Sequence, residues 1–176
     1  MSRTNPYKSK RRRASKTLLV LGEGFSDQMF LKHLKKLYSF NTGIAITVKK
    51  GKGGDAKSII IGAIRTVGAF DRKVVVLDND KPKNEMDRAR KTAKSNGIEL
   101  LENTPCLEYL LISAINKKPG EKNSIWCKNE FESKYLNKNK RDRPSEYDKL
   151  FPKQLLDSKR SGIIELDKLI SIMEGR

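Results

Sequence analysis

Three acidic side chains follow two apolar segments of this 176-residue chain. Glu23 comes directly after the apolar run 17–22, and Asp78 and Asp80 come directly after the apolar run 73–77. A single carboxylate after a strand is usually a loop or capping residue. Two carboxylates spaced two residues apart lie on one side of an extended segment, and a third from another strand end completes a set of oxygen ligands. Such a set suits Mg²⁺, so the pattern indicates a candidate metal site.

These acids can meet only if the chain forms a sheet whose strands run in the same direction. Apolar runs alternate along the chain with segments of helical periodicity. The expected strands are 17–22, 44–48, 73–77 and 98–101, and the expected helices are 26–40, 55–67, 84–96 and 105–115. Strict alternation of this kind predicts an α/β, Rossmann-like fold with a mostly parallel four-stranded sheet flanked by helices. Functional groups of such sheets gather at the carboxyl ends of the strands.

The composition indicates a polyanionic partner. The chain has 38 Lys and Arg against 21 Asp and Glu, a formal charge of +17, which favours nucleic acid over an anionic membrane. Residues 1–16 contain seven basic residues and no acid, and we predict a disordered arm that binds nucleic acid through Arg11, Arg12 and Arg13. The alternative for this arm is a solubilising tail.

Several classes of protein are excluded. No apolar run approaches the roughly 20 residues that span a bilayer. Two cysteines are too few for a disulfide framework, and His33 is the only histidine. We expect a cytoplasmic protein without a membrane partner, and we expect His33 to be surface or half-buried rather than catalytic.

Lysines near two glycine- or acid-rich loops are the remaining candidates for phosphate contact. The loop 51–55 lacks the spacing of a P-loop, but Lys50, Lys52 and Lys57 flank it and could approach phosphates. The alternative is a plain flexible loop. Lys81 adjoins the acidic pair, where a phosphate contact and a solvated loop lysine are equally compatible with the sequence.

The chain divides into three predicted parts. The basic arm covers 1–16, the α/β domain covers 17–116, and a basic, mainly helical extension covers 117–176. Short helices are expected within that extension at 126–135, 146–156 and 162–173.

The acidic residues also carry a family resemblance. The stretch 18–30, which contains Glu23, and the later stretch 74–80, which contains the Asp-x-Asp pair, together resemble a Toprim domain. That family has a glutamate after its first strand and an Asp-x-Asp after its third. The overall form resembles the RloB-like and OLD-type Toprim proteins of bacterial and phage defence loci.

Two further segments are similar to the RloB-like branch. Gly53-Gly-Asp55 precedes the second helix, and the segment 103–110 resembles an Asn-Pro-Cys-Phe-Glu signature. The segment departs from that signature because Thr104 is inserted and Leu107 replaces the aromatic residue. The resemblance covers about residues 17–115.

The resemblance implies phosphodiester chemistry that depends on Mg²⁺, with Mn²⁺ as a substitute. Asp78 and Asp80 would bind the metal, Glu23 would be a further ligand or the general acid/base, and Glu108 would be another ligand or a supporting carboxylate. Topoisomerases and primases of the family need further domains, so the expected activity is a nuclease that cleaves DNA or RNA with water as the nucleophile. Other defence proteins and a second copy of the chain are possible partners.

Two other interpretations compete with this one. The first is a non-catalytic nucleic-acid-binding or effector-assembly module with a Toprim-like core. The second is a receiver domain of the two-component type, which fits poorly because receivers place adjacent acids after the first strand and are rarely this basic.

Overall fold

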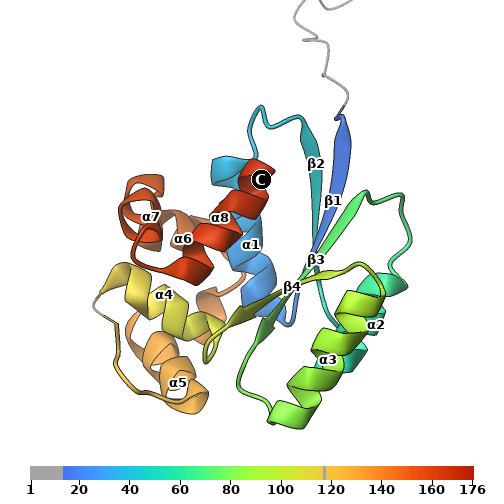
Figure 1. Ribbon diagram of the computed structural model, residues 1–176. Coiled ribbons are helices and arrows are strands. Elements are labelled where there is room, and N and C mark those ends of the chain that lie inside the picture. Colours follow the sequence, from blue (N-terminus) through green and yellow to red (C-terminus); the bar gives the residue numbers. More distant parts are fainter. Residues whose placement is uncertain (1–13, 117) are drawn as a thin grey trace, which may run out of the picture.

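The computed structural model describes residues 14–116 and 118–176 (Figure 1). Its centre is a sheet of four parallel strands in the order β2-β1-β3-β4. The strands are β1 (Lys16–Gly22), β2 (Ile44–Lys50), β3 (Arg72–Asp78) and β4 (Glu99–Asn103). The predicted α/β class and the predicted four-stranded parallel sheet are confirmed. Of the predicted arm, only residues 14–16 are described, and Lys16 already belongs to β1; Arg11, Arg12 and Arg13 lie outside the described residues.

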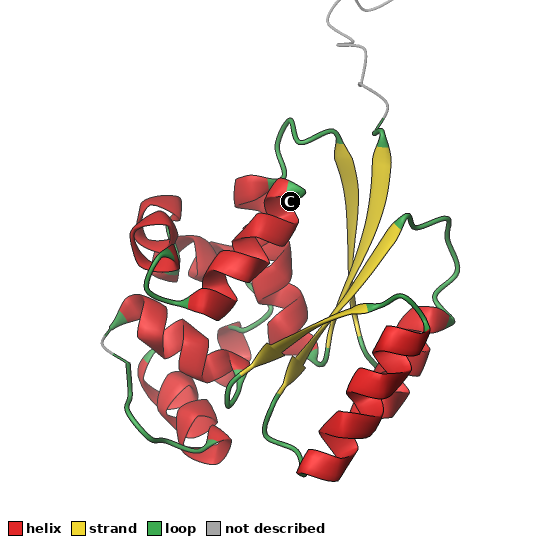
Figure 2. Cartoon of the chain, viewed as in Figure 1, coloured by secondary structure: helices red, strands yellow, loops and turns green. Residues whose placement is uncertain are grey.

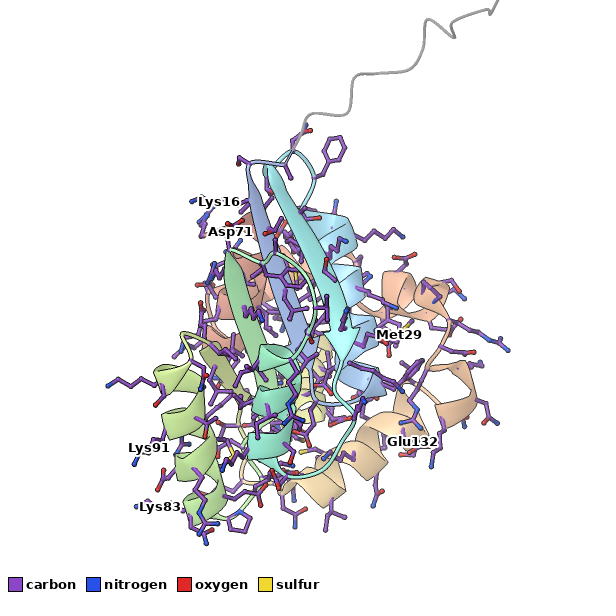
Figure 3. The ribbon with its side chains drawn as sticks, turned by 90° about the vertical axis from the view of Figure 1, so that its right-hand side faces the viewer. Lys16, Met29, Asp71, Lys83, Lys91 and Glu132 are labelled. Carbon is purple, nitrogen blue, oxygen red and sulfur yellow. The ribbon has the colours of Figure 1, made fainter. Side chains whose placement is uncertain are left out.

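Helices cover both faces of the sheet (Figure 2). Those that connect the strands are α1 (Phe25–Tyr38), α2 (Ala56–Ile64) and α3 (Lys83–Ser95), and α4 (Leu107–Ile115) follows β4. Figure 1 shows α2 and α3 together on one side of the sheet and α1 with α4 on the other. In Figure 3, which looks onto α2 and α3, Lys83 and Lys91 of α3 point away from the sheet.

Successive side chains of each strand point to opposite faces of the sheet, so the core consists of two apolar clusters, one on each face. Leu18 and Val20 of β1 point to the α1 side and join the larger apolar cluster, whereas Leu21 and Val75 join a smaller cluster with α2 and α3. Because the central strands are buried on both sides, their apolar runs are nearly continuous, as expected for a parallel sheet.

Two helix starts decide how the site is built. Asp55 caps α2, since its Oδ1 accepts a hydrogen bond of 2.6 Å from the Ser58 N–H. The α1 helix begins one residue earlier than expected, with Gly24 at the N-cap position. Asp27 instead lies in the first turn, where its Oδ2 accepts a hydrogen bond of 2.9 Å from the Gly24 N–H.

The helices after residue 117 pack onto the α1 side of the sheet. They are α5 (Ser124–Lys134), a short 3₁₀ helix (Lys138–Lys140), α6 (Pro144–Leu150), α7 (Lys153–Arg160) and α8 (Ile164–Glu174). Phe131, Phe151 and Leu169 are buried in the larger cluster together with α1 and α4. The helix expected over 146–156 is wrong as a single element, because Pro152 cannot continue a helix and disfavours helical geometry at Phe151.

In the part of the chain that the structure describes, no helix has the length and apolarity needed to cross a membrane.

Candidate functional site

The edge formed by the carboxyl ends of β1 and β3 brings the predicted acids together. Asp78 is the last residue of β3, and Glu23 follows the last residue of the neighbouring β1. The Asp78 N–H donates a hydrogen bond of 3.3 Å to Glu23 Oε2. Asp80 lies two residues further on and is linked to Asp78 through a shared lysine contact. The parallel order of adjacent strands therefore places all three acids at one edge.

Gly22 allows the turn that carries Glu23 to pack closely against α1. A Cβ atom on Gly22 would lie 2.5 Å from the Asp27 Cβ, a distance that atoms do not tolerate. The Gly22 carbonyl also accepts a hydrogen bond of 2.7 Å from the Gly51 N–H at the end of β2. The turn that carries Glu23 is thus packed between α1 and the loop after β2.

Asp78 is fixed by the helix that follows β4. Its side chain is buried, and Oδ1 accepts a hydrogen bond of 2.9 Å from the Leu107 N–H in the first turn of α4. Burial, with the negative charge of Asp27 as the next cause, raises the pKa of Asp78 to about 7. The carboxylate is therefore easier to protonate than an ordinary aspartate unless a cation stands beside it.

Lys128 of α5 is such a cation, and no motif of the sequence pointed to it. Its Nζ lies 3.2 Å from Asp78 Oδ2 and 3.2 Å from Asp80 Oδ2. Burial alone would lower the pKa of Lys128, but the two carboxylates outweigh burial and raise it. One positive charge thus sits between the two acids of the Asp-x-Asp pair.

Lys81 provides the second internal cation. Its Nζ donates a hydrogen bond of 2.8 Å to Glu23 Oε1, and both side chains are largely buried. Burial opposes protonation of Lys81, but the contact with Glu23 outweighs it and raises the pKa. Of the two interpretations left open for Lys81, neither describes this arrangement, because the lysine pairs with the predicted catalytic acid.

A cavity of about 320 Å³, here called the acidic pocket, opens beside these residues. Its walls include Glu23, Asp27, Asp78, Glu108, Lys128 and Arg141. The predicted Glu108 therefore reaches the same pocket as Glu23 and Asp78, from the first turn of α4. Asp80 and Lys81 stand at the same edge but do not line the cavity.

Two oxygens among these carboxylates have no partner within the described part of the chain. Asp27 Oδ1 and Glu108 Oε2 are both buried without a hydrogen bond to any described residue. Burial, together with the charges of Glu108 and Glu23, raises the pKa of Asp27 to about 6 despite the hydrogen bond from Gly24. Asp27 was not among the predicted site residues, although its place four residues after Glu23 at a helix start was a usable signal.

The donor chemistry of the pocket fits a hard divalent cation. Carboxylate oxygens from separate elements are what Mg²⁺ prefers, and two of them lack a partner among the described residues. In the arrangement of residues 14–116 and 118–176, however, no three His, Cys, Asp or Glu side chains are close enough to hold a metal ion. Lysine ammonium groups contact the edge carboxylates instead, so metal binding would require Lys128 to move away.

The three lysines near the loop 51–55 that were predicted to contact phosphates do not all line one cavity. Lys50 and Lys52 line a second cavity near β2 and α2. Lys57 is exposed on α2 but does not line that cavity.

Searches with this chain found no matching protein-family model, no similar curated protein and no similar solved structure. The resemblance to Toprim proteins therefore remains a prediction that depends on the residues quoted above.

Proposed function

We propose that this chain is a Mg²⁺-dependent nuclease that hydrolyses phosphodiester bonds of DNA or RNA at the acidic pocket. The observation that carries the proposal is the Lys128 ammonium group between the carboxylates of Asp78 and Asp80, with Glu23 hydrogen-bonded to the Asp78 N–H. This arrangement supports the view that the carboxylates of Asp78 and Asp80 can bind one cation together. The basic character of the chain supports a nucleic-acid substrate, because +17 favours binding to a phosphate backbone.

Each group of residues in the pocket would have a separate role in hydrolysis. Glu23, Asp78 and Asp80 would bind Mg²⁺, with Glu108 as a further carboxylate. The bound ion would supply a water of lowered pKa and charge stabilisation at the phosphate oxygens. Where Glu23 is not a ligand, one of its carboxylate oxygens would accept the proton of the attacking water. Lys128 and Arg141, on the α5 side of the pocket, would contact the phosphate of the bound strand.

The resemblance to RloB-like and OLD-type proteins favours a role in bacterial or phage-related defence. That setting is part of the proposal.

One observation favours a second candidate function. Lys81 and Lys128 form ion pairs with all three edge carboxylates, as expected of an acidic cluster that has only a structural role. The chain would then be a non-catalytic nucleic-acid-binding or effector-assembly module. Its affinity for nucleic acid would fall with salt but would not depend on Asp78 or Asp80.

Cleavage assays separate the two functions. Plasmid DNA, single-stranded DNA and tRNA are incubated with Mg²⁺ and the wild type, Glu23→Gln, Asp80→Asn or Glu132→Gln. Glu132 lines the same pocket from α5 but is not at the strand edge, so Glu132→Gln controls for the loss of one charge. We expect Glu23→Gln and Asp80→Asn to lower the rate by about a hundredfold or more, as removal of groups that act in the transition state does. We expect Glu132→Gln to retain most of the activity.

Two outcomes contradict the nuclease proposal. If the wild type cleaves none of the three substrates, the enzymatic function is wrong and the binding module is favoured. If all variants cleave like the wild type, the activity does not come from the acidic pocket.

A further inference from the structure

A second cavity of about 570 Å³, here called the basic pocket, lies between the end of β2 and α2. Ligand pockets of proteins usually have volumes of about 300–1,000 Å³, so it is large enough for a small organic ligand. Its charged lining consists of Lys49, Lys50, Lys52 and Arg65. No acidic side chain of the described residues lines this cavity, in contrast to the acidic pocket.

The four cations of the basic pocket have no counter-ion in the part of the chain that the structure describes. Lys81 and Lys128 are paired with carboxylates, as are several exposed lysines and arginines elsewhere. Among the described residues, no Asp or Glu oxygen lies within 4.0 Å of the charged groups of Lys49, Lys50, Lys52 or Arg65. Four such cations around one cavity create a positive potential that attracts an anion.

The position of Lys49 follows from strand register. Lys49 of β2 pairs with Leu21 of β1, and side chains at paired positions of neighbouring strands share one face of the sheet. Leu21 belongs to the apolar cluster under α2, so Lys49 is on the α2 side. Arg65 follows the last residue of α2, and the two cations thus approach the cavity from a strand and from a helix.

The floor of the basic pocket is apolar and open. Leu21 and Ile59 are buried, and Ile61 of α2 also lines the cavity. Gly62 stands among them in α2, and a Cβ atom built on it would meet nothing within 4 Å. Glycine is unfavourable inside a helix, so its presence here has no local backbone reason. The missing side chain keeps the cavity open.

The basic pocket adjoins the predicted catalytic acid. Gly51 lines the pocket, and a Cβ atom on it would lie 3.0 Å from the Glu23 carbonyl oxygen. The same residue donates the hydrogen bond of 2.7 Å to Gly22. The backbone of Glu23 therefore contacts the loop that forms one wall of the basic pocket, and a nucleic-acid strand that extended from the acidic edge towards β2 would meet Gly51 and the lysines of this pocket.

From this arrangement we infer that the basic pocket binds a nucleotide of the substrate strand that flanks the cleaved bond. Lys49, Lys52 and Arg65 contact its phosphate, and the sugar or base packs on the floor formed by Leu21, Ile59 and Ile61. The inference rests on the proposed nuclease function for the identity of the strand, but binding in the basic pocket does not depend on catalysis.

The test is the binding of a short fluorescein-labelled oligonucleotide, DNA in one arm and RNA in the other, measured by fluorescence anisotropy in EDTA. Gly62→Glu introduces a carboxylate on the wall of the cavity that the four cations line, at a position where a Cβ atom meets nothing within 4 Å, and Gly62→Ala adds only that Cβ atom. Val67→Glu adds the same charge on the highly exposed loop after α2, outside the cavity. We expect Gly62→Glu to weaken binding by about tenfold and to reduce the dependence on salt, and we expect the other two variants to bind within about twofold of the wild type.

The inference fails if Gly62→Glu binds as well as Val67→Glu, or if the wild type binds AMP or inorganic phosphate in this pocket but no oligonucleotide. These outcomes are independent of cleavage in Mg²⁺, which tests the proposed function. If both proposals are correct, Glu23→Gln loses cleavage in Mg²⁺. Gly62→Glu still weakens oligonucleotide binding in EDTA, whether Glu23 is present or replaced.

Discussion

The two pockets at the carboxyl edge of the sheet differ in what neutralises their charges. In the acidic pocket and at its edge, Glu23 contacts Lys81, and Asp78 and Asp80 contact Lys128. In the basic pocket, no described residue neutralises the four cations. The described chain thus provides counter-ions for its edge acids but none for these bases. The basic pocket can therefore accept an external anion without breaking an internal ion pair, whereas an external cation at the acidic pocket must displace a lysine.

The difference follows from how the two faces of the sheet are covered. The helices after residue 117 pack on the α1 side, and α5 brings Lys128 to the acids. Of the described helices, the opposite face carries α2 and α3 alone, whose smaller apolar cluster leaves the end of β2 exposed. The helices after residue 117 thus provide the Lys128 ion pairs on the α1 side of the sheet. On the α2 side, the cations of the basic pocket remain open to solvent.

The largest effect is expected from removing the internal counter-ion of the acidic pocket. Lys128→Ala leaves the buried Asp78 without its cation and should lower the stability of the metal-free protein by about 1–2 kcal/mol, less than for a fully buried pair because Lys128 is half exposed. For a chain of this size that is a decrease in Tm of a few degrees. We expect Mn²⁺ to raise the Tm of Lys128→Ala more than that of the wild type, since the lysine no longer competes.

The matched control is Lys134→Ala on the same helix, whose lysine pairs with Glu130 at the surface. It should change neither the Tm in EDTA nor the response to Mn²⁺. Equal responses of Lys128→Ala and the wild type to Mn²⁺ would show that Lys128 does not occupy a cation site.

The sequence was sufficient for the sheet and for the acids at its edge. Apolar runs and turn residues are local signals, and parallel strands must end at a common edge, so the pattern of residues places Glu23 and Asp78 at one edge of the sheet. Their contact also requires β1 and β3 to be neighbours, which the structure shows. Glu108 could be placed there only through the family resemblance, because its position depends on how α4 starts after β4.

The other parts of the site depend on contacts between distant segments. Lys128 lies in the helix expected over 126–135 and Arg141 in the polar loop after it, but only tertiary packing brings the two side chains to the acidic pocket beside Asp78. His33 was expected to be surface or half-buried, but it is buried: its Nε2 donates a hydrogen bond of 2.7 Å to the Phe151 carbonyl of the distant C-terminal segment, and its Nδ1 lies 3.3 Å from Asp148. The helix over 55–67, which contains Gly62, was expected from the sequence, but the open cavity beside that glycine was not.

A smaller effect, with a distinct pH dependence, is expected from the buried charge of Asp27. The pKa of Asp27 is raised from the ordinary 3.8 to about 6, so the folded state binds the proton more tightly than the unfolded state does. Stability is therefore lost as the pH rises from about 4 through 6. Asp27→Asn removes this penalty and should stabilise the protein by about 1 kcal/mol at pH 8, less than the shift alone gives because the amide must also be buried.

This gain should disappear at about pH 4–5, where Asp27 is protonated in the folded state. Thermal unfolding of the wild type and Asp27→Asn across this range measures it. Glu132→Gln makes the same change in net charge at the rim of the pocket and should show no such pH dependence. A stabilisation by Asp27→Asn that is independent of pH would mean that burial does not disfavour the charge of Asp27.

The smallest effect tests the basic pocket through its glycine. If Gly62 is present to keep the cavity open rather than to satisfy the backbone, Gly62→Ala should stabilise the protein by about 0.5–1 kcal/mol, because alanine is the better helix former and its Cβ meets nothing within 4 Å. Gly54→Ala is the matched contrast, since Gly54 has a φ of +100° and alanine is strained there. Urea unfolding of the two variants should give changes of opposite sign. A destabilised Gly62→Ala would mean that the glycine serves the packing of α2 and is not present to keep the cavity open.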